Sequence, residues 1–118
     1  SDHLVLVLPY TSEAHHIIGA AELACMKPTA TIVNIGRGGL IDENALVLAL
    51  QAGRLAAAGL DVFEGEPRVN PALLTLPNVV LTPHIASATV PTRLAMADLA
   101  ADNLIAFFEG RGALTPVF

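Results

Sequence analysis

The stretch "ATIVNIGRGGLIDENALVLALQAG", from Ala30 to Gly53, decides the fold predicted for this chain. Its first seven residues form an apolar run that ends in a glycine-rich turn, which is typical of a strand buried in a sheet. Asp42 then precedes a segment whose apolar residues recur at helical spacing, and Gly53 stands where such a helix would end. The stretch therefore predicts a strand, a tight turn and a helix in succession.

The same alternation continues on both sides of this stretch. Further apolar runs, each expected to form a strand, cover Leu4–Leu8, Ala57–Leu60 and Asn78–Leu81. A short helix is expected at Gly19–Met26, and a long final helix is expected from Thr89 or Thr92 through Phe108, within about residues 89–110. Strands that alternate with helices through short turns indicate right-handed crossovers and a parallel sheet. We expect an α/β fold with about four strands, and we expect the strand at Leu4–Leu8 to be covered on both faces.

The composition excludes several classes of protein. With 53% hydrophobic and 14% charged residues in 118, the chain is far from the disordered class. No apolar run approaches the roughly 20 residues that span a membrane, and no basic leader precedes an apolar core, so we expect a cytoplasmic protein. Six basic residues and a net charge of −5 argue against nucleic-acid binding. The single Cys25 excludes an internal disulfide and a cysteine-based metal cage.

The beginning of the chain, "SDHLVLVLPY", has no methionine and leads almost directly into an apolar strand. We therefore expect the chain to be a piece of a longer protein. The strand at Leu4–Leu8 would then expose an apolar edge, which favours self-association.

Polar residues of three different types follow the predicted strands. Arg37 follows the second strand, Glu66 the third and His84 the fourth. Because ligands of open parallel sheets bind beyond the carboxyl ends of the strands, we expect these side chains to meet in one region. A carboxylate that holds one nitrogen of an imidazole favours its protonated form, and an arginine offers a fork of donors to a substrate carboxylate. The three residues therefore predict an acid–base site.

Taken singly, each of these residues has a simpler interpretation. His84 alone is more often a structural hydrogen-bonding residue, Arg37 could cap a helix or pair with Asp42, and Glu64 and Glu66 could be solvated loop carboxylates. Only their shared place after the strands favours a catalytic role.

Two other clusters are less favourable candidates for a site. His15 and His16 suggest a metal, but adjacent loop residues seldom both act as ligands, and no carboxylate or cysteine stands at metal-ligand spacing from them in the sequence. We therefore expect no metal. Glu64 and Glu66 do not offer the facing pair that a glycosidase needs.

Three motifs give the chain a resemblance to a known family. "NIGRGGLID", "AAAGLDVFEGEP" and "LPNVVLTPHIASAT" resemble the signature blocks of the D-isomer-specific 2-hydroxyacid dehydrogenases, in the same order, and "LVLVLPYTSEAHHIIG" resembles the segment before them. The resemblance covers essentially the whole chain. It implies the C-terminal half of a Rossmann-like doubly wound sheet, with residues 1–118 forming a partial dinucleotide-binding domain. The G-x-G-x-x-G half, the substrate domain and the remaining N-terminal part of the protein would be missing.

The resemblance also implies a role for each site residue. Arg37 would bind the carboxylate and carbonyl of a small 2-keto acid, Glu66 would pair with His84, and His84 would be the catalytic acid–base. Asp61 would face the nicotinamide carboxamide of NAD or NADP. The further cofactor contacts implied are Pro9, Thr11, Ile35, Gly36, Arg37, His84 and Ala86.

One departure from the family pattern bears on the substrate. Ala86 stands where the family usually has glycine after the P-H-I triplet, as in branches that resemble glyoxylate, hydroxypyruvate and 2-ketogluconate reductases.

The resemblance implies a homodimeric oxidoreductase, with the isolated chain inactive. A non-enzymatic NAD(H)-sensing or corepressor module of the same fold is the alternative.

Overall fold

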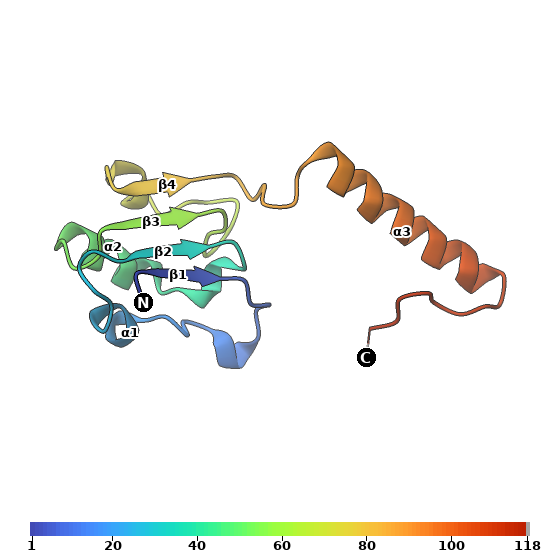
Figure 1. The fold of residues 1–118 in the computed structure, drawn as a ribbon, viewed down its shortest axis with the longest axis horizontal. Coiled ribbons are helices and arrows are strands. Elements are labelled where there is room, and N and C mark those ends of the chain that lie inside the picture. The colour runs from blue at the N-terminus through green and yellow to red at the C-terminus, as the bar shows by residue number, and fades with distance from the viewer. Residues whose placement is uncertain (118) are drawn as a thin grey trace. The chain divides into compact units, whose positions relative to one another are not determined.

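Four parallel strands form one sheet in the order of the chain (Figure 1). The computed structural model describes residues 1–117. The strands are β1 (His3–Leu6), β2 (Thr31–Asn34), β3 (Ala57–Leu60) and β4 (Val79–Leu81). Leu4 lies opposite Ile32, Ile32 opposite Ala58, and Ala58 opposite Val79, so every neighbouring pair is parallel. The α/β class and the four-stranded parallel sheet predicted from the sequence are confirmed.

The helices begin and end close to the residues that the sequence predicts. They are α1 (Ala20–Ala24), α2 (Glu43–Gln51) and α3 (Val90–Phe108), with short 3₁₀ turns η1 (Ser12–Ala14), η2 (Gly38–Leu40) and η3 (Leu73–Thr75). Asp42 caps α2, because its Oδ1 accepts the backbone N–H groups of Asn44 and Ala45 at 3.0 Å each. Gly53 follows α2 with φ of 64°, a left-handed conformation that glycine adopts at helix ends.

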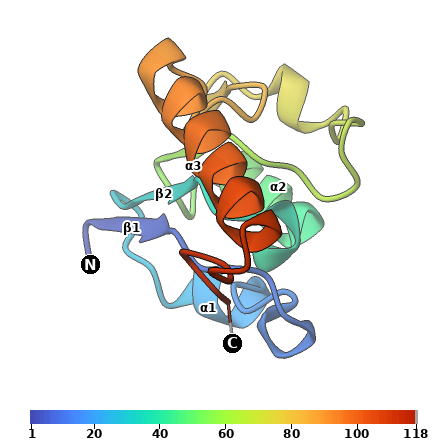
Figure 2. The same cartoon turned by 90° about the vertical axis from the view of Figure 1, so that its right-hand side faces the viewer.

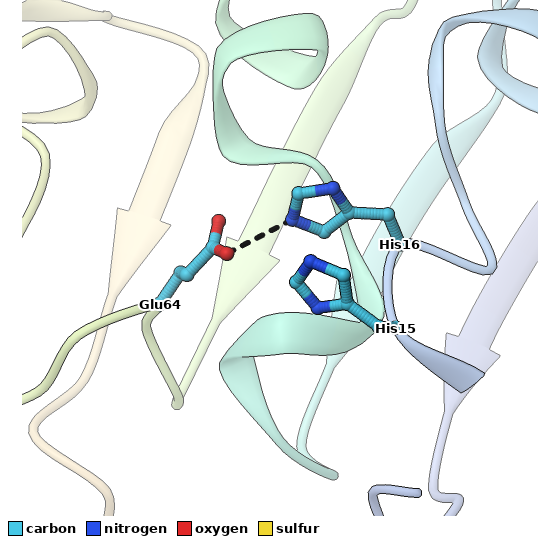
Figure 3. A group of neighbouring side chains, drawn as sticks. All are labelled: His15, His16 and Glu64. Carbon is cyan, nitrogen blue, oxygen red and sulfur yellow. Dashed lines mark hydrogen bonds and ion pairs between the residues drawn. The ribbon is translucent and has the colours of Figure 1, made fainter. Parts of the chain in front are cut away.

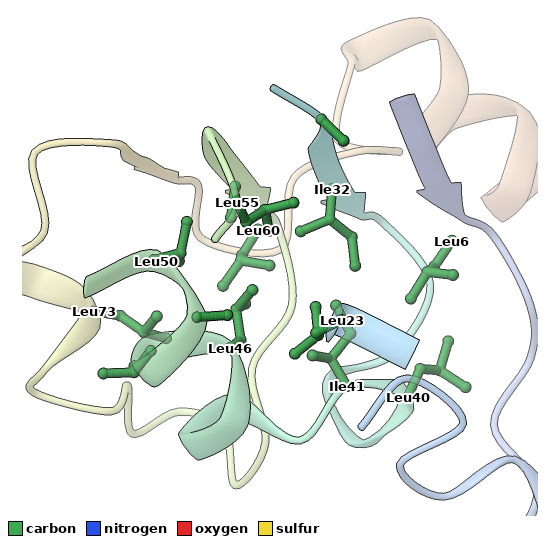
Figure 4. Packing of buried hydrophobic residues seen from close by; sticks show 14 of the residues in the cluster. Leu6, Leu23, Ile32, Leu40, Ile41, Leu46, Leu50, Leu55, Leu60 and Leu73 are labelled. Carbon is green, nitrogen blue, oxygen red and sulfur yellow. The ribbon is translucent and has the colours of Figure 1, made fainter. Parts of the chain in front are cut away.

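The core lies between one face of the sheet and the helices α1 and α2 (Figures 2 and 4). Strand residues of alternating positions, such as Ile32 and Leu60, point into it, and Leu46 and Leu50 of α2 pack against them. Each such side chain contributes about 1.5–3 kcal/mol when it is fully buried. This core fixes the carboxyl ends of the strands, from which the candidate site is built.

β1 differs from its prediction. The strand ends at Leu6 instead of Leu8, and Val5 is 51% exposed whereas Leu6 is 6% exposed. The strand lies at the edge of the sheet, and only the face that Leu6 occupies is covered by the core. The expectation of a strand covered on both faces is therefore wrong for the described chain.

The chain divides into two compact units, Ser1–His84 and Ile85–Phe118. In the second unit, Thr89 is the N-cap of α3, since its Oγ1 accepts the N–H of Thr92 at 3.4 Å. Of the two predicted starts, Thr89 is thus the one used. Asn103 holds the segment after α3, because its Oδ1 accepts the N–H of Thr115 at 3.0 Å. No helix in the described part of the chain is both long enough and apolar enough to cross a bilayer.

Candidate active site

The turn after β2 presents Arg37 at the carboxyl edge of the sheet. Asn34 is buried, and its side chain holds the turn at both ends: Oδ1 accepts the N–H of Gly36 at 3.0 Å, and Nδ2 donates to the carbonyl of Arg37 at 2.9 Å. A Cβ at Gly36 would lie 2.8 Å from the carbonyl oxygen of Leu8, so this position needs glycine. The exposed Arg37 side chain donates from Nη1 to the carbonyl of Gly36 at 2.7 Å.

The loop after β3 packs against this turn and is hydrogen-bonded to α2. A Cβ at Gly38 would lie 1.9 Å from the carbonyl carbon of Phe63, which shows how closely the two backbones approach. The N–H of Glu64 donates to Oε1 of Glu43 at 2.6 Å. Glu43 is buried, and this burial raises the pKa of its carboxyl group above the ordinary value. The loop that carries Glu66 is therefore packed against the turn that carries Arg37 and anchored to the first residue of α2.

Glu66 and His84 form an ion pair between the loops after β3 and β4. Oε2 of Glu66 lies 2.9 Å from Nδ1 of His84, and Oε1 accepts the N–H of Phe63 at 2.9 Å. The hydrogen bond with His84 lowers the pKa of Glu66, and the N–H of Phe63 and the charges of His84 and Arg37 act in the same direction, against a smaller effect of burial. Because an ionised carboxylate only accepts, Nδ1 of His84 carries the proton of this hydrogen bond.

A shallow cleft of about 460 Å³ connects the three residues. Its lining consists of Tyr10, His15, Arg37, Gly38, Gly39, Phe63, Glu64, Gly65, Glu66 and His84. The side chains expected to meet after the second, third and fourth strands thus share one cleft. It holds a fixed cation, a carboxylate and an imidazole, which is a set suited to binding an acidic substrate and moving a proton.

The other residues predicted to contact a cofactor follow the carboxyl ends of the strands but do not line this cleft. Asp61 is buried, and its Oδ1 accepts a hydrogen bond from Oγ1 of Thr82 at 2.5 Å. Thr11 caps η1, with its Oγ1 accepting the N–H of Ala14 at 3.3 Å, and Ile35 is 42% exposed beside the buried Gly36. Pro9 lies in the exposed segment after β1. Ala86 belongs to the second unit, and its cofactor contact stays a prediction.

Thr82 and Glu43 support the site but are not among the residues predicted from the sequence. Thr82, the partner of Asp61, directly follows β4, so the rule that sites form at strand ends could have found it. Glu43 had no such signal, because an acidic residue in the first turn of a helix is ordinary.

No carboxylate stands at metal-ligand spacing from the two adjacent histidines in the sequence, but one lies beside them in the structure. Oε1 of Glu64 lies 2.9 Å from Nε2 of His16, although the two residues are 48 positions apart. The fold, not the local sequence, brings this carboxylate to the histidines.

The chain is similar to curated proteins over nearly its whole length. It is 54% identical over 112 residues to glyoxylate/hydroxypyruvate reductase B of Shigella boydii, and 56% identical over 110 residues to glyoxylate reductase of Thermococcus gammatolerans. These matches cover 94% and 93% of this chain but 35% and 33% of the relatives. The chain thus spans about a third of the length of the curated relatives that it matches.

A solved structure is also similar to nearly the whole of this chain, and the chain again covers about a third of it. The NADPH-dependent glyoxylate/hydroxypyruvate reductase of Sinorhizobium meliloti, in complex with NADP and malonate, superposes with a TM-score of 0.95 at 52% identity, over 98% of this chain and 36% of that one. Residues 1–86 match the family described as D-isomer specific 2-hydroxyacid dehydrogenase, NAD binding domain. The chain belongs to this family.

Proposed function

We propose that the chain is the second half of the cofactor domain of an enzyme that reduces a small 2-keto acid to the D-2-hydroxy acid with NADH or NADPH. The observation that carries the proposal is the 2.9 Å contact between Glu66 and His84 in a cleft that also holds Arg37. The relatives that the chain matches over about a third of their length are reductases of this kind. A cation, a carboxylate and an imidazole in one cleft are the groups that this reaction needs.

Each of the three side chains has a distinct part in the proposed reaction. The guanidinium of Arg37 binds the substrate carboxylate and carbonyl oxygen through its planar fork of donors. Glu66 holds Nδ1 of His84 and stabilises the imidazolium, so that Nε2 donates its proton to the carbonyl oxygen. NADH or NADPH supplies the hydride. In the reverse direction His84 accepts the proton of the hydroxyl group.

The residues around the cleft fit the nicotinamide end of such a cofactor. Gly36 and Gly38 keep the backbone after β2 free of side chains at points where a Cβ would clash, and Asp61 is held by Thr82 at the neighbouring strand end. We propose Pro9, Thr11, Ile35, Gly36 and Asp61 as cofactor contacts. The 118 residues contain no G-x-G-x-x-G motif for the pyrophosphate, so that part of the cofactor needs another part of the protein.

Glyoxylate and hydroxypyruvate are the substrates that the comparisons favour. The two curated relatives are named for them, and the Sinorhizobium meliloti enzyme holds the carboxylate malonate. We propose a cytoplasmic homodimer as the working form.

Turnover by the full-length protein tests the proposal. Glyoxylate, hydroxypyruvate and 2-ketogluconate are each offered with NADH and with NADPH, and oxidation of the cofactor is followed by absorbance. We expect turnover of at least one acid. Cofactor binding without turnover of any of the three would contradict the enzyme and favour a sensing or corepressor module.

The isolated chain supplies a second test. Because it has no phosphate-binding motif, we expect it to bind NADH weakly and to show no turnover. Micromolar affinity in a fluorescence titration would contradict this expectation.

A further inference from the structure

Three side chains of types that can bind a metal ion gather outside the Glu66–His84 pair. His15, His16 and Glu64 each offer one ligand atom, and these atoms lie within 4.8 Å of one another. The two imidazole rings are stacked, with centroids 3.8 Å apart, and the Glu64 carboxylate lies beside them (Figure 3). His15 and Glu64 line the same cleft as Arg37, but the proposed reduction gives none of the three cluster residues a role.

The backbone explains why two adjacent histidines point to the same side. In extended chain, neighbouring side chains point to opposite sides. His16 instead has φ of 52°, a left-handed conformation that is uncommon for a residue other than glycine. Its N–H donates to the carbonyl of Gly39 at 2.8 Å, and the N–H of Ile18 donates to the carbonyl of Leu40 at 3.1 Å, so the loop is fixed against η2.

The carboxylate of the cluster is fixed from the other side. The backbone N–H of Glu64 is held by Oε1 of Glu43 at 2.6 Å, and Oε1 of Glu64 meets Nε2 of His16 at 2.9 Å. The histidine segment is therefore anchored to η2, and the Glu64 segment is anchored to the first residue of α2. The cluster is preorganised at the backbone, while its side chains remain half-buried or exposed and able to turn.

We propose that His15, His16 and Glu64 bind a divalent transition-metal ion such as zinc. Two imidazoles and one carboxylate are ligands that Zn²⁺ takes at bond lengths of about 2.0–2.2 Å, whereas Mg²⁺ and Ca²⁺ prefer sites made of oxygen. Such bonds bring the donor atoms to about 3–3.5 Å from one another, which small rotations of these side chains provide. Water completes the coordination of the ion.

Tyr10 supports one of the proposed ligands. Its hydroxyl lies 3.1 Å from Nδ1 of His15. A metal-binding imidazole is commonly oriented by a hydrogen bond at its second ring nitrogen. The tyrosine thus hydrogen-bonds to Nδ1 of His15, which leaves Nε2 of His15 to bind the ion. In His16 the nitrogen that faces Glu64 is also Nε2.

Calorimetric titration of Zn²⁺ into the EDTA-stripped 118-residue chain at about pH 7.5 tests the proposal. We expect one ion per chain. His16→Ala and Glu64→Gln should each weaken binding more than about tenfold, and Tyr10→Phe should weaken it by about tenfold. Co²⁺ should give a visible absorption band that Glu64→Gln removes.

Three controls separate this site from other places where zinc can bind. His3→Ala removes a histidine bonded to Thr31, Cys25→Ser removes the exposed thiol, and His84→Ala removes the histidine of the ion pair. None of them should change the affinity by more than about twofold if each group is independent of the site. Circular dichroism checks that each variant is folded. If His16→Ala unfolds, Glu64→Gln tests the site in its place, because Glu64 is exposed and its replacement should not disturb the fold. No binding, or binding that Glu64→Gln leaves intact or that His84→Ala removes, would overturn the proposal.

Discussion

Nδ1 of His84 lies 2.9 Å from Oε2 of Glu66, although 18 positions separate the two residues in the sequence. The contact joins the loops after β3 and β4 and leaves the second nitrogen of the imidazole for chemistry. Whether it also stabilises the fold depends on the ionisation of Glu66.

The stability of the chain should depend on pH through Glu66. The pKa of this carboxyl is lowered from its ordinary value of 4.5, so the folded state gains stability above that pH and loses it as the pH falls through the lowered value. Glu66→Gln should therefore cost more stability at about pH 6 than at about pH 3. Because the side chain is 35% exposed, the difference should stay below about 1 kcal/mol. Urea unfolding in EDTA measures it, and an equal cost at both pH values would contradict this account.

Glu43 should show the opposite dependence. Burial raises its pKa, so the charged form of Glu43 lowers the stability of the folded state at pH values above the raised pKa. This loss of stability disappears as the pH falls through the raised pKa toward the ordinary value. Glu43→Gln keeps an oxygen that can accept the N–H of Glu64, and it should be at least as stable as the parent chain at neutral pH. Glu43→Ala leaves that N–H without its acceptor and should cost about 1–3 kcal/mol. Urea unfolding measures both variants, and a Glu43→Gln variant that is less stable than the parent chain at neutral pH would contradict this account.

Gly38 should tolerate no side chain. A Cβ there would lie 1.9 Å from the carbonyl carbon of Phe63, so Gly38→Ala must separate the Arg37 turn from the Glu66 loop. We expect a loss of about 2–4 kcal/mol in the free energy of unfolding. Gly59→Ala is the matched control, because its Cβ would meet only the side chain of Val33 at 3.6 Å. Similar losses for the two variants would show that the close approach of the two loops is unimportant.

Arg37 should determine the affinity for the acid in the full-length enzyme. Lysine keeps the charge but loses the planar fork, so Arg37→Lys should lower kcat/KM for the 2-keto acid by about 10–100-fold, mainly through KM. Arg68→Lys, at an exposed arginine outside the lining of the cleft, should have almost no effect. Steady-state kinetics with both variants separates loss of the fork from a general change of charge, and equal kinetics for both would contradict the role of Arg37.

Much of this fold could be predicted from the sequence, because the signals are local. The apolar run before Gly36, the cap at Asp42 and the glycine at Gly53 all act within a few residues, and the structure agrees with each of them. The convergence of Arg37, Glu66 and His84 could be predicted as well, since parallel strands bring their carboxyl ends to one edge.

What the sequence could not predict depends on contacts between distant segments. The contact of Glu64 with His16 spans 48 positions, and the left-handed backbone of His16 has no signal in the pair of histidines. The buried role of Glu43 likewise depends on the loop that folds over it. The length of β1 was overestimated because apolar residues continue beyond the last strand pairing at Leu6.

The acid–base role of His84 is tested most directly by replacing it with glutamine in the full-length protein and measuring kcat and the dissociation constant of NADPH on the same preparation. The account predicts that kcat falls by about 10²–10⁴-fold while the dissociation constant changes by less than about twofold. It also predicts that adding Glu66→Gln to His84→Gln lowers kcat little further, because the two side chains act as one unit. A His84→Gln enzyme that keeps more than about a tenth of the parent kcat, or that loses NADPH binding instead, would contradict the account.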